Sequence, residues 1–260
     1  MENVSAQNAS TEKVFTTRER QAQQRRKRII NASMELFQEK CVEDTSMEEV
    51  AKRAGVGAAT VYRYFSTKIE LVIETAQAYW EKIAGEYLKE LELANCREDV
   101  KYCKEDIGRD EEEAKDGCAE KNSATGYEQL AGILNIFYKI FKEQKPFLKF
   151  LQEFDVFVKK YQISEERLTD YENGILKLKP YMTSVLEKGL SDKSLFFTCS
   201  VDEMYFSLTH TLIALMEKQA VGGDILSSDQ EVEGQKQFQI IAGLLLSGMQ
   251  YIQQSGIDGK

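Results

Sequence analysis

Residues 46–65 carry the pattern that most restricts the fold of this chain. Four apolar residues recur at i, i+3, i+4 and i+7, which is the spacing of one buried helix face: Met47, Val50, Ala51 and Ala54. Gly55 follows at once, and glycine ends helices readily because it adopts a positive φ without a Cβ clash. Val61 and Phe65 then mark the inner face of a second short helix. Two short helices around a tight glycine turn predict a helix-turn-helix, whose second helix enters the DNA major groove.

The residues on either side of this pair extend the pattern. Ile30, Ser33, Met34 and Phe37 repeat the helical spacing and predict a longer helix before the pair. Four consecutive cations at residues 25–28 lie near its start, where they can reach phosphate groups; the alternative is a solvated helix face. The hydroxyls of the second helix and Lys68, at the start of the next helix, are further phosphate-binding groups.

The block over residues 25–72 resembles the DNA-binding domain of the TetR family of bacterial transcriptional regulators, and it covers about 50 of the 260 residues. The matching residues are Leu36-Phe37, Thr45-Ser46, Val50-Ala51, Ala54-Gly55-Val56, Thr60-Val61-Tyr62, Tyr64-Phe65 and Lys68. The resemblance implies that the DNA contacts come from Arg28, Thr45, Ser46, Ala58, Ala59, Thr60, Tyr62, Arg63, Tyr64 and Lys68.

Two positions depart from the family pattern. Cys41 stands where a glycine usually ends the first helix, so either the turn differs or a non-glycine residue bears a left-handed cost of roughly 1 kcal/mol. Gly57 replaces the usual Ser or Thr cap of the second helix, at a cost of a few tenths of a kcal/mol. Base reading then falls to Thr60, Arg63 and Tyr64, or to contacts between the two alanines and thymine methyl groups.

Composition narrows the class of protein. With only two prolines in 260 residues and helical apolar spacing throughout, the chain is expected to be all-α, with about nine helices. No apolar run reaches the roughly 18 residues that span a bilayer, and five scattered cysteines fit a reducing cytoplasm. A single histidine, without phosphate-loop, nucleophile or metal-ligand motifs, argues against an enzyme. We therefore expect no catalytic site, metal or cofactor.

The net charge of −9 is unevenly distributed. Residues 1–70 hold 12 Lys and Arg against 10 Asp and Glu, a net of +2, so the remainder carries −11. Because attraction to phosphate acts within a Debye length of about 10 Å, a basic head on an acidic body is compatible with DNA binding.

The chain is expected to divide into three parts. Residues 1–17 are polar and predict a disordered arm, residues 18–68 a three-helix DNA-binding domain, and residues 69–260 a larger helical regulatory and dimerisation domain. Within the last part, residues 95–125 are highly charged and contain Cys96, Cys103 and Cys118. This stretch is read as a mobile acidic insertion, with a redox-sensing thiol pair or a partner-docking element as the alternatives.

The larger domain carries further helix patterns. A connecting helix is expected from residue 68 into the low nineties, and Ser164 is expected to cap a helix to about Leu190 that Pro180 kinks or splits. Ser200 with Glu203 predicts the start of another helix, and Ser228 with Glu231 predicts the start of the last one, ending near Gln254.

The resemblance also implies an inducer cavity and a homodimer. An aromatic stripe in the middle of the domain reads either as core or as cavity wall, and the predicted ligand-binding residues are Phe150, Phe154, Phe157, Tyr171, Tyr205, Phe206 and His210. The ligand is expected to be a small hydrophobic or aromatic molecule. The predicted dimer interface lies on the last two helices and comprises Leu212, Met216, Ile241, Leu244, Leu245, Gly248 and Ile252.

These features predict a cytoplasmic, dimeric regulator of transcription that binds double-stranded operator DNA. The resemblance favours a repressor that a ligand in the larger domain releases from DNA. The alternative is an architectural or division-linked DNA-binding protein controlled by a protein partner.

Overall fold

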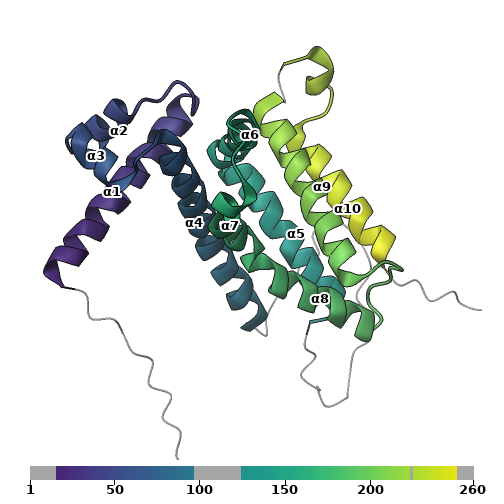
Figure 1. The fold of residues 1–260 in the computed structure, drawn as a ribbon. Helices are drawn as coiled ribbons and strands as arrows, with labels where there is room; N and C mark the ends of the chain where they lie inside the picture. Colours follow the sequence, from purple (N-terminus) through teal and green to yellow (C-terminus); the bar gives the residue numbers. More distant parts are fainter. Residues whose placement is uncertain (1–15, 97–123, 223–224, 251–260) are drawn as a thin grey trace, which may run out of the picture. The chain divides into compact units, whose positions relative to one another are not determined.

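The computed structural model describes residues 16–96, 124–222 and 225–250. These residues form ten α-helices and two short 3₁₀ helices, so the expected all-α fold is confirmed (Figure 1). The chain divides into two compact units, residues 1–75 and residues 76–260. Helix α4 (Lys68–Cys96) begins in the first unit and continues into the second.

Unit 1 contains α1 (Thr17–Glu39), α2 (Met47–Ala54), α3 (Ala58–Tyr64) and the first two turns of α4. Ser46 caps α2 in a reciprocal box with Glu49, which satisfies amide groups that the first helical turn leaves unbonded. Gly55 ends α2 with φ 65° and ψ 39°, the left-handed conformation expected from the sequence. Cys41 does not have a positive φ, so the turn after α1 differs from the glycine form and avoids its strain.

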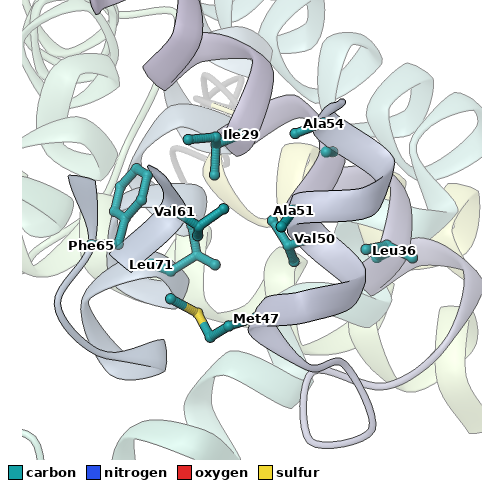
Figure 2. Packing of buried hydrophobic residues seen from close by; sticks show 10 residues of the cluster. Ile29, Leu36, Met47, Val50, Ala51, Ala54, Val61, Phe65 and Leu71 are labelled. Atoms are coloured by element: carbon teal, nitrogen blue, oxygen red, sulfur yellow. The ribbon is translucent and has the colours of Figure 1, made fainter. Parts of the chain in front are cut away.

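Apolar residues from all four helices form the core of unit 1. Figure 2 shows these side chains meeting between the helices: Ile29, Leu36, Met47, Val50, Ala51, Ala54, Val61, Phe65 and Leu71. Val61 and Phe65 are fully buried, and each such side chain stabilises the fold by roughly 1.5–3 kcal/mol. The inner face of α3 is thereby packed against α1 and α2.

Unit 2 contains the rest of α4 and six further α-helices. They are α5 (Gly126–Glu143), α6 (Lys145–Lys160), α7 (Glu165–Ile175), α8 (Lys179–Ser191), α9 (Val201–Gly222) and α10 (Gly234–Met249), with 3₁₀ helices η1 (Leu176–Leu178) and η2 (Ser227–Gln230). Helix α5 packs against both α8 and α10, and α6 packs against α9. No helix in the described ranges is both long enough and apolar enough to cross a bilayer.

Glycines allow α5 and α8 to approach closely. A Cβ atom on Gly126 would overlap the backbone of Gly189, so a larger residue does not fit at the crossing. The Gly126 amide also donates to the Asp192 carboxylate at 2.8 Å. The start of α5 is therefore held against the end of α8 by both close packing and a hydrogen bond.

The structure confirms one expected helix break and corrects one expected helix start. The helix expected from Ser164 to about Leu190 is split ahead of Pro180 into α7, η1 and α8, one of the two outcomes predicted for this proline, and the described residues hold ten α-helices where about nine were expected. The capping box expected at Ser228 and Glu231 is wrong, because residues there form η2 and α10 begins only at Gly234. The box at Ser200 and Glu203 is confirmed by three hydrogen bonds between these residues at the start of α9.

Several predictions fall outside the described residues. They concern the polar arm up to residue 15, the acidic segment with Cys103 and Cys118, and Ile252 at the predicted dimer interface.

Candidate nucleic-acid interface and internal cavity

Helix α3 presents one face to the core and the opposite face to solvent. Val61 and Phe65 point inward, whereas Ala59, Tyr62 and Arg63 are exposed. The remaining predicted contact residues of this helix, Ala58, Thr60 and Tyr64, are half-buried. The arrangement gives a short rigid helix with a small methyl group, a phenol and a guanidinium on its outer surface.

The two larger outer side chains are positioned by neighbours. The Tyr62 hydroxyl donates to the Glu48 carboxylate at 3.4 Å, and partial desolvation together with this carboxylate raises the pKa of Tyr62. The phenol therefore keeps its proton and remains a hydrogen-bond donor near neutral pH. The Arg63 guanidinium lies 5.6 Å from the centre of the Tyr64 ring, a cation–π distance that restricts its motion.

Three other predicted DNA-binding residues have local bonding partners. Thr45 is buried and its hydroxyl donates to the Cys41 carbonyl at 3.1 Å, so its side chain serves the turn and is not presented to solvent. Ser46 is exposed while capping α2. The Lys68 ammonium donates to the Glu43 carbonyl at 2.8 Å, which ties the start of α4 to the loop before α2.

The basic run at residues 25–28 lies within the first half of α1, and its members make different contacts. Arg26 forms an ion pair with Glu74 of α4, and its guanidinium lies 5.2 Å from the centre of the Phe65 ring. Burial raises the pKa of Glu74 despite the opposing effect of Arg26. Arg25, Lys27 and Arg28 are exposed, so Arg26 helps to hold α1 in place and its three neighbours face solvent.

Unit 2 encloses a cavity of about 110 Å³. Its walls come from α4, α5, α6, the α7–η1 segment and α9, and they are almost wholly apolar. The lining residues include Trp80, Ile83, Tyr87, Ile133, Phe137, Phe147, Leu151, Leu176, Tyr205, Phe206, Thr209, His210 and Ile213. Pockets for small molecules commonly measure about 300–1,000 Å³. A ligand that fills a pocket of such a volume therefore requires the wall of this cavity to move outward.

The cavity corrects part of the predicted ligand site. Phe150, Phe154, Phe157 and Tyr171 do not line it, and the three phenylalanines are packed in the core instead. Phe147, from the same aromatic stripe, does line it, as do the predicted residues Tyr205, Phe206 and His210. Helical spacing identifies the apolar face of α6, but it does not show which residues meet a neighbour and which meet empty space.

Several polar side chains lie on the helices that form the cavity wall. The Trp80 indole donates to the Tyr171 hydroxyl at 3.2 Å. Burial, then the nearby Asp155 carboxylate, raises the pKa of Glu217 on α9 to about 7. Burial also raises the pKa of Asp155 on α6. The charge of Asp155 therefore makes Glu217 ionise less readily than in water, while Asp155 itself remains exposed to solvent.

The predicted dimer surface is only partly exposed. Leu212 and Met216 are buried inside the subunit, and Met216 lines the cavity, so their predicted place in the interface is wrong for this conformation. On α10, Ile240 and Leu244 are exposed by 47% and 63%. Gly243, Ser247 and the predicted residue Gly248 are exposed beside them, while the predicted residues Ile241 and Leu245 are half-buried. An apolar stripe with small neighbours thus remains uncovered along α10.

Residues 29–75 match the family described as "Bacterial regulatory proteins, tetR family". This segment is a DNA-binding domain of the TetR type. Over 60 residues the chain is 38% identical to the HTH-type transcriptional repressor KstR of Rhodococcus jostii. The matched stretch covers 23% of this chain and 28% of that repressor. The chain thus matches less than a third of the length of this curated relative.

Solved structures of TetR-family proteins share the fold over most of the chain. FadR of Thermus thermophilus, a TetR-family repressor in complex with lauroyl-CoA, has a TM-score of 0.55 and 18% identity, covering 90% of this chain and all of that one. A putative TetR-family regulator from Mesorhizobium loti has a TM-score of 0.57 and 16% identity, covering 88% of this chain and 98% of that one. At these identities the likeness shows a shared fold for unit 2 as well as unit 1.

Proposed function

We propose that this TetR-family protein is a transcriptional repressor that binds operator DNA through unit 1 and leaves it when a small apolar ligand enters unit 2. The observation that carries the proposal is the geometry of α2 and α3. The left-handed turn at Gly55 and the buried residues Val61 and Phe65 hold α3 with its opposite face free for the major groove. The proposal places the protein in the cytoplasm, where the bacterial chromosome lies.

In this proposal the side chains of α3 have different roles in DNA binding. Arg63 reads a base edge, since arginine is the commonest partner of guanine in the major groove. The Tyr62 hydroxyl turns from the Glu48 carboxylate, its partner in the free protein, to donate to a phosphate, and so positions α3 without reading sequence. Ala58 and Ala59 are small enough to let the backbone of α3 approach the bases.

Selection of bound genomic DNA fragments, followed by footprinting, tests the DNA-binding part. We expect a palindromic site whose half-sites lie about one DNA turn apart. Arg63→Ala should relax preference at one or two base positions, whereas Tyr62→Phe should weaken binding to all sequences about equally. Binding by the wild-type protein without any sequence preference would refute the proposal and favour an architectural DNA-binding protein.

The ligand part rests on the apolar cavity in unit 2. Since the walls are aliphatic and aromatic, an apolar chain or ring system matches them. Phe206 and His210 line the cavity and are also exposed, which marks where it reaches the surface. The Lys179 ammonium lies 5.0 Å from the centre of the Phe206 ring and 3.1 Å from the Asp202 carboxylate. An acyl chain with a polar or anionic head at this rim fits the arrangement, and acyl-CoA esters, one of which is bound in the FadR structure, are the first probes to use.

Trp80 gives a direct assay of ligand binding. It is the only tryptophan in the chain and it lines the cavity, so a bound acyl chain should change its fluorescence. Ala84→Phe fills the cavity from α4 and should abolish the response while leaving DNA binding intact. Val156→Phe, at an exposed position on α6, is the matched control and should respond as the wild type does. A fluorescence response that survives Ala84→Phe would place the ligand elsewhere.

Helix α4 is the proposed connection between the two activities. Its first turns pack in the core of unit 1 through Leu71, and its later turns line the cavity through Trp80, Ile83 and Tyr87. A ligand that widens the cavity favours a different position of α4 and so disfavours the DNA-bound state. By linkage, operator DNA must weaken ligand binding by the same factor, which the Trp80 assay can measure with and without DNA.

The proposal also requires a homodimer. A palindromic site needs two recognition helices related by a two-fold axis. We propose that the exposed stripe of α10 around Ile240 and Leu244 packs against the same stripe of a second copy, with Gly243, Ser247 and Gly248 allowing close approach.

A further inference from the structure

The positive charge of unit 1 lies almost entirely outside its helix-turn-helix core. Residues 29–75, which match the TetR family, hold five Lys and Arg against eight Asp and Glu, a net charge of −3. Residues 17–28 hold six Lys and Arg against one Glu, a net charge of +5. We call residues 17–28 the α1 extension. The part of the protein that carries the recognition helix is therefore acidic, although its proposed target is a polyanion.

Most cations of the core also have internal partners. Lys40 pairs with Glu49 at 2.5 Å, and Arg53 pairs with Glu39 at 2.7 Å. The Lys68 ammonium donates to a backbone carbonyl. Among the five core cations of the described structure, Lys52 and Arg63 are the two without a carboxylate or carbonyl partner. Most of the core's positive charge is therefore already paired within unit 1.

The α1 extension has the opposite character. None of the described residues before Ile29 is buried, and the 12 residues of the extension span about 18 Å at 1.5 Å per residue, with Arg26 near their end contacting Phe65 and Glu74 (Figure 1). Its start is held by the capping box of Thr16 with Glu19, which occupies the one acidic side chain. Within the described part of the chain, Arg26 is the one cation of the extension with an ion pair. Five guanidinium or ammonium groups thus face solvent: Arg18, Arg20, Arg25, Lys27 and Arg28.

Residues with donor groups follow one face of this helix. Together they line an open groove along α1: Gln21, Gln24, Arg25, Lys27, Arg28 and Asn31. Arginine, lysine and side-chain amides are the groups that most often bond to DNA phosphates. A solvated helix face needs no such concentration of one charge, and like charges this close destabilise an isolated helix. A row of phosphates would remove that repulsion.

We propose that the grooved face of the α1 extension binds the phosphate backbone of duplex DNA and supplies most of the electrostatic attraction of unit 1. The acidic helix-turn-helix core then contributes shape and base contacts. The proposal rests on the DNA-binding function proposed above and assigns most of the salt-dependent part of the affinity to a segment that precedes the residues matching the TetR family. Arg26 is a positioning residue here, because its pair with Glu74 fixes the rotation of α1 and so directs Arg25, Lys27 and Arg28 outward.

The test compares three variants on one selected DNA site, with Kd measured by fluorescence anisotropy between about 50 and 300 mM salt. The first is the triple variant Arg25→Gln, Lys27→Gln, Arg28→Gln. The second removes the same charge from exposed positions of unit 2, namely Lys82→Gln, Lys142→Gln and Lys149→Gln. The third, Arg26→Gln, lies in the same helix. Circular dichroism and thermal unfolding establish that each variant is folded.

Each lost phosphate contact should reduce the slope of log K against log salt by about 0.9, so the α1 triple variant should lose close to 3 per protomer. Its affinity should fall about tenfold or more near 0.1 M salt, while its preferred base sequence stays unchanged. Hydroxyl-radical footprinting should show lost protection only at backbone positions outside the bases that α3 protects. The unit 2 variant should keep the wild-type slope, and Arg26→Gln should lower thermal stability with a smaller change of slope.

Two results would overturn the inference. A wild-type salt slope in the α1 triple variant, with sequence-specific binding retained, would refute the role of the extension and leave the proposed function standing. An equal loss of slope in the unit 2 variant would show that net charge, and not the grooved face, sets the affinity. Failure of the wild-type protein to select any DNA sequence would instead count against the proposed function itself.

Discussion

Replacement of Glu217 by glutamine should stabilise the protein above neutral pH and have little effect in acid. Glu217 lies on α9, where burial and the Asp155 carboxylate of α6 raise its pKa from 4.5 to about 7. The same two carboxylates contribute to the raised pKa of Tyr171 on α7, while Lys159 partly offsets the effect at Asp155. The Glu217 carboxylate accepts no hydrogen bond from the described residues, so glutamine removes a charge without breaking a bond.

The direction in which the stability changes with pH follows from proton linkage. Because the folded protein binds the Glu217 proton more tightly than the unfolded chain does, the stabilisation is fully present below pH 4.5 and is lost as the pH rises through about 7. The difference between 4.5 and about 7 corresponds to about 3.4 kcal/mol at 1.36 kcal/mol for each pKa unit. Glu217 is only half-buried, so solvent screening reduces the expected effect to roughly 1–2 kcal/mol at pH 8.

Urea unfolding followed by circular dichroism at pH 5, 6, 7 and 8 measures this effect. We expect the free energy of unfolding of Glu217→Gln to exceed that of the wild type by roughly 1–2 kcal/mol at pH 8 and to approach it at pH 5. Glu172→Gln, at an exposed position on α7, is the matched control and should show no such pH dependence. A Glu217→Gln variant that is less stable than the wild type at pH 8 would refute the reasoning, since the carboxylate would then be bonded favourably.

Three further predictions concern packing and assembly. Phe65→Ala empties a fully buried site between α1, α3 and α4 and should lower the free energy of unfolding of unit 1 by about 3–5 kcal/mol; a thermal shift of only a degree or two would contradict this. Gly126→Ala places a Cβ in the backbone of Gly189 and should cost at least about 1–3 kcal/mol in urea unfolding, whereas Gly132→Ala in the same helix, with open space around its Cβ, should cost nothing measurable. Leu244→Glu should convert the proposed dimer to a monomer in light scattering without loss of helicity, and an unchanged dimeric mass would exclude α10 from the interface.

The local features of unit 1 could be predicted because they depend on neighbouring residues. The i, i+3, i+4, i+7 spacing of Met47, Val50 and Ala51 defines the buried face of α2 whatever packs against it. Gly55 takes the left-handed conformation that few other residues tolerate and so ends α2, and Ser46 caps the start of the same helix. The exposure of Tyr62 and Arg63 then follows from the burial of Val61 and Phe65 on the opposite side of α3.

The features that were predicted wrongly depend on contacts between helices. Leu212 and Met216 carry the apolar pattern expected of an interface, but α9 turns them into its own subunit. Phe150 and Phe154 look the same as Phe147 in the sequence, yet only Phe147 borders the cavity. Thr45 matches the family pattern of a DNA contact, and its burial and bond to Cys41 appear only once the loop is folded.

Amino-acid order alone therefore established the all-α class, the turn of the helix-turn-helix, the break ahead of Pro180 and the charge asymmetry between the α1 extension and the rest of unit 1. Packing of helices distant in the sequence decided where the cavity lies, which aromatic residues border it, that Arg26 faces Glu74 while its neighbours face solvent, and that Glu217 lies near Asp155. Periodicity and capping act over one or two helical turns, whereas cavities, ion pairs and shifted pKa values arise from the relative rotation and spacing of whole helices, which no local pattern encodes.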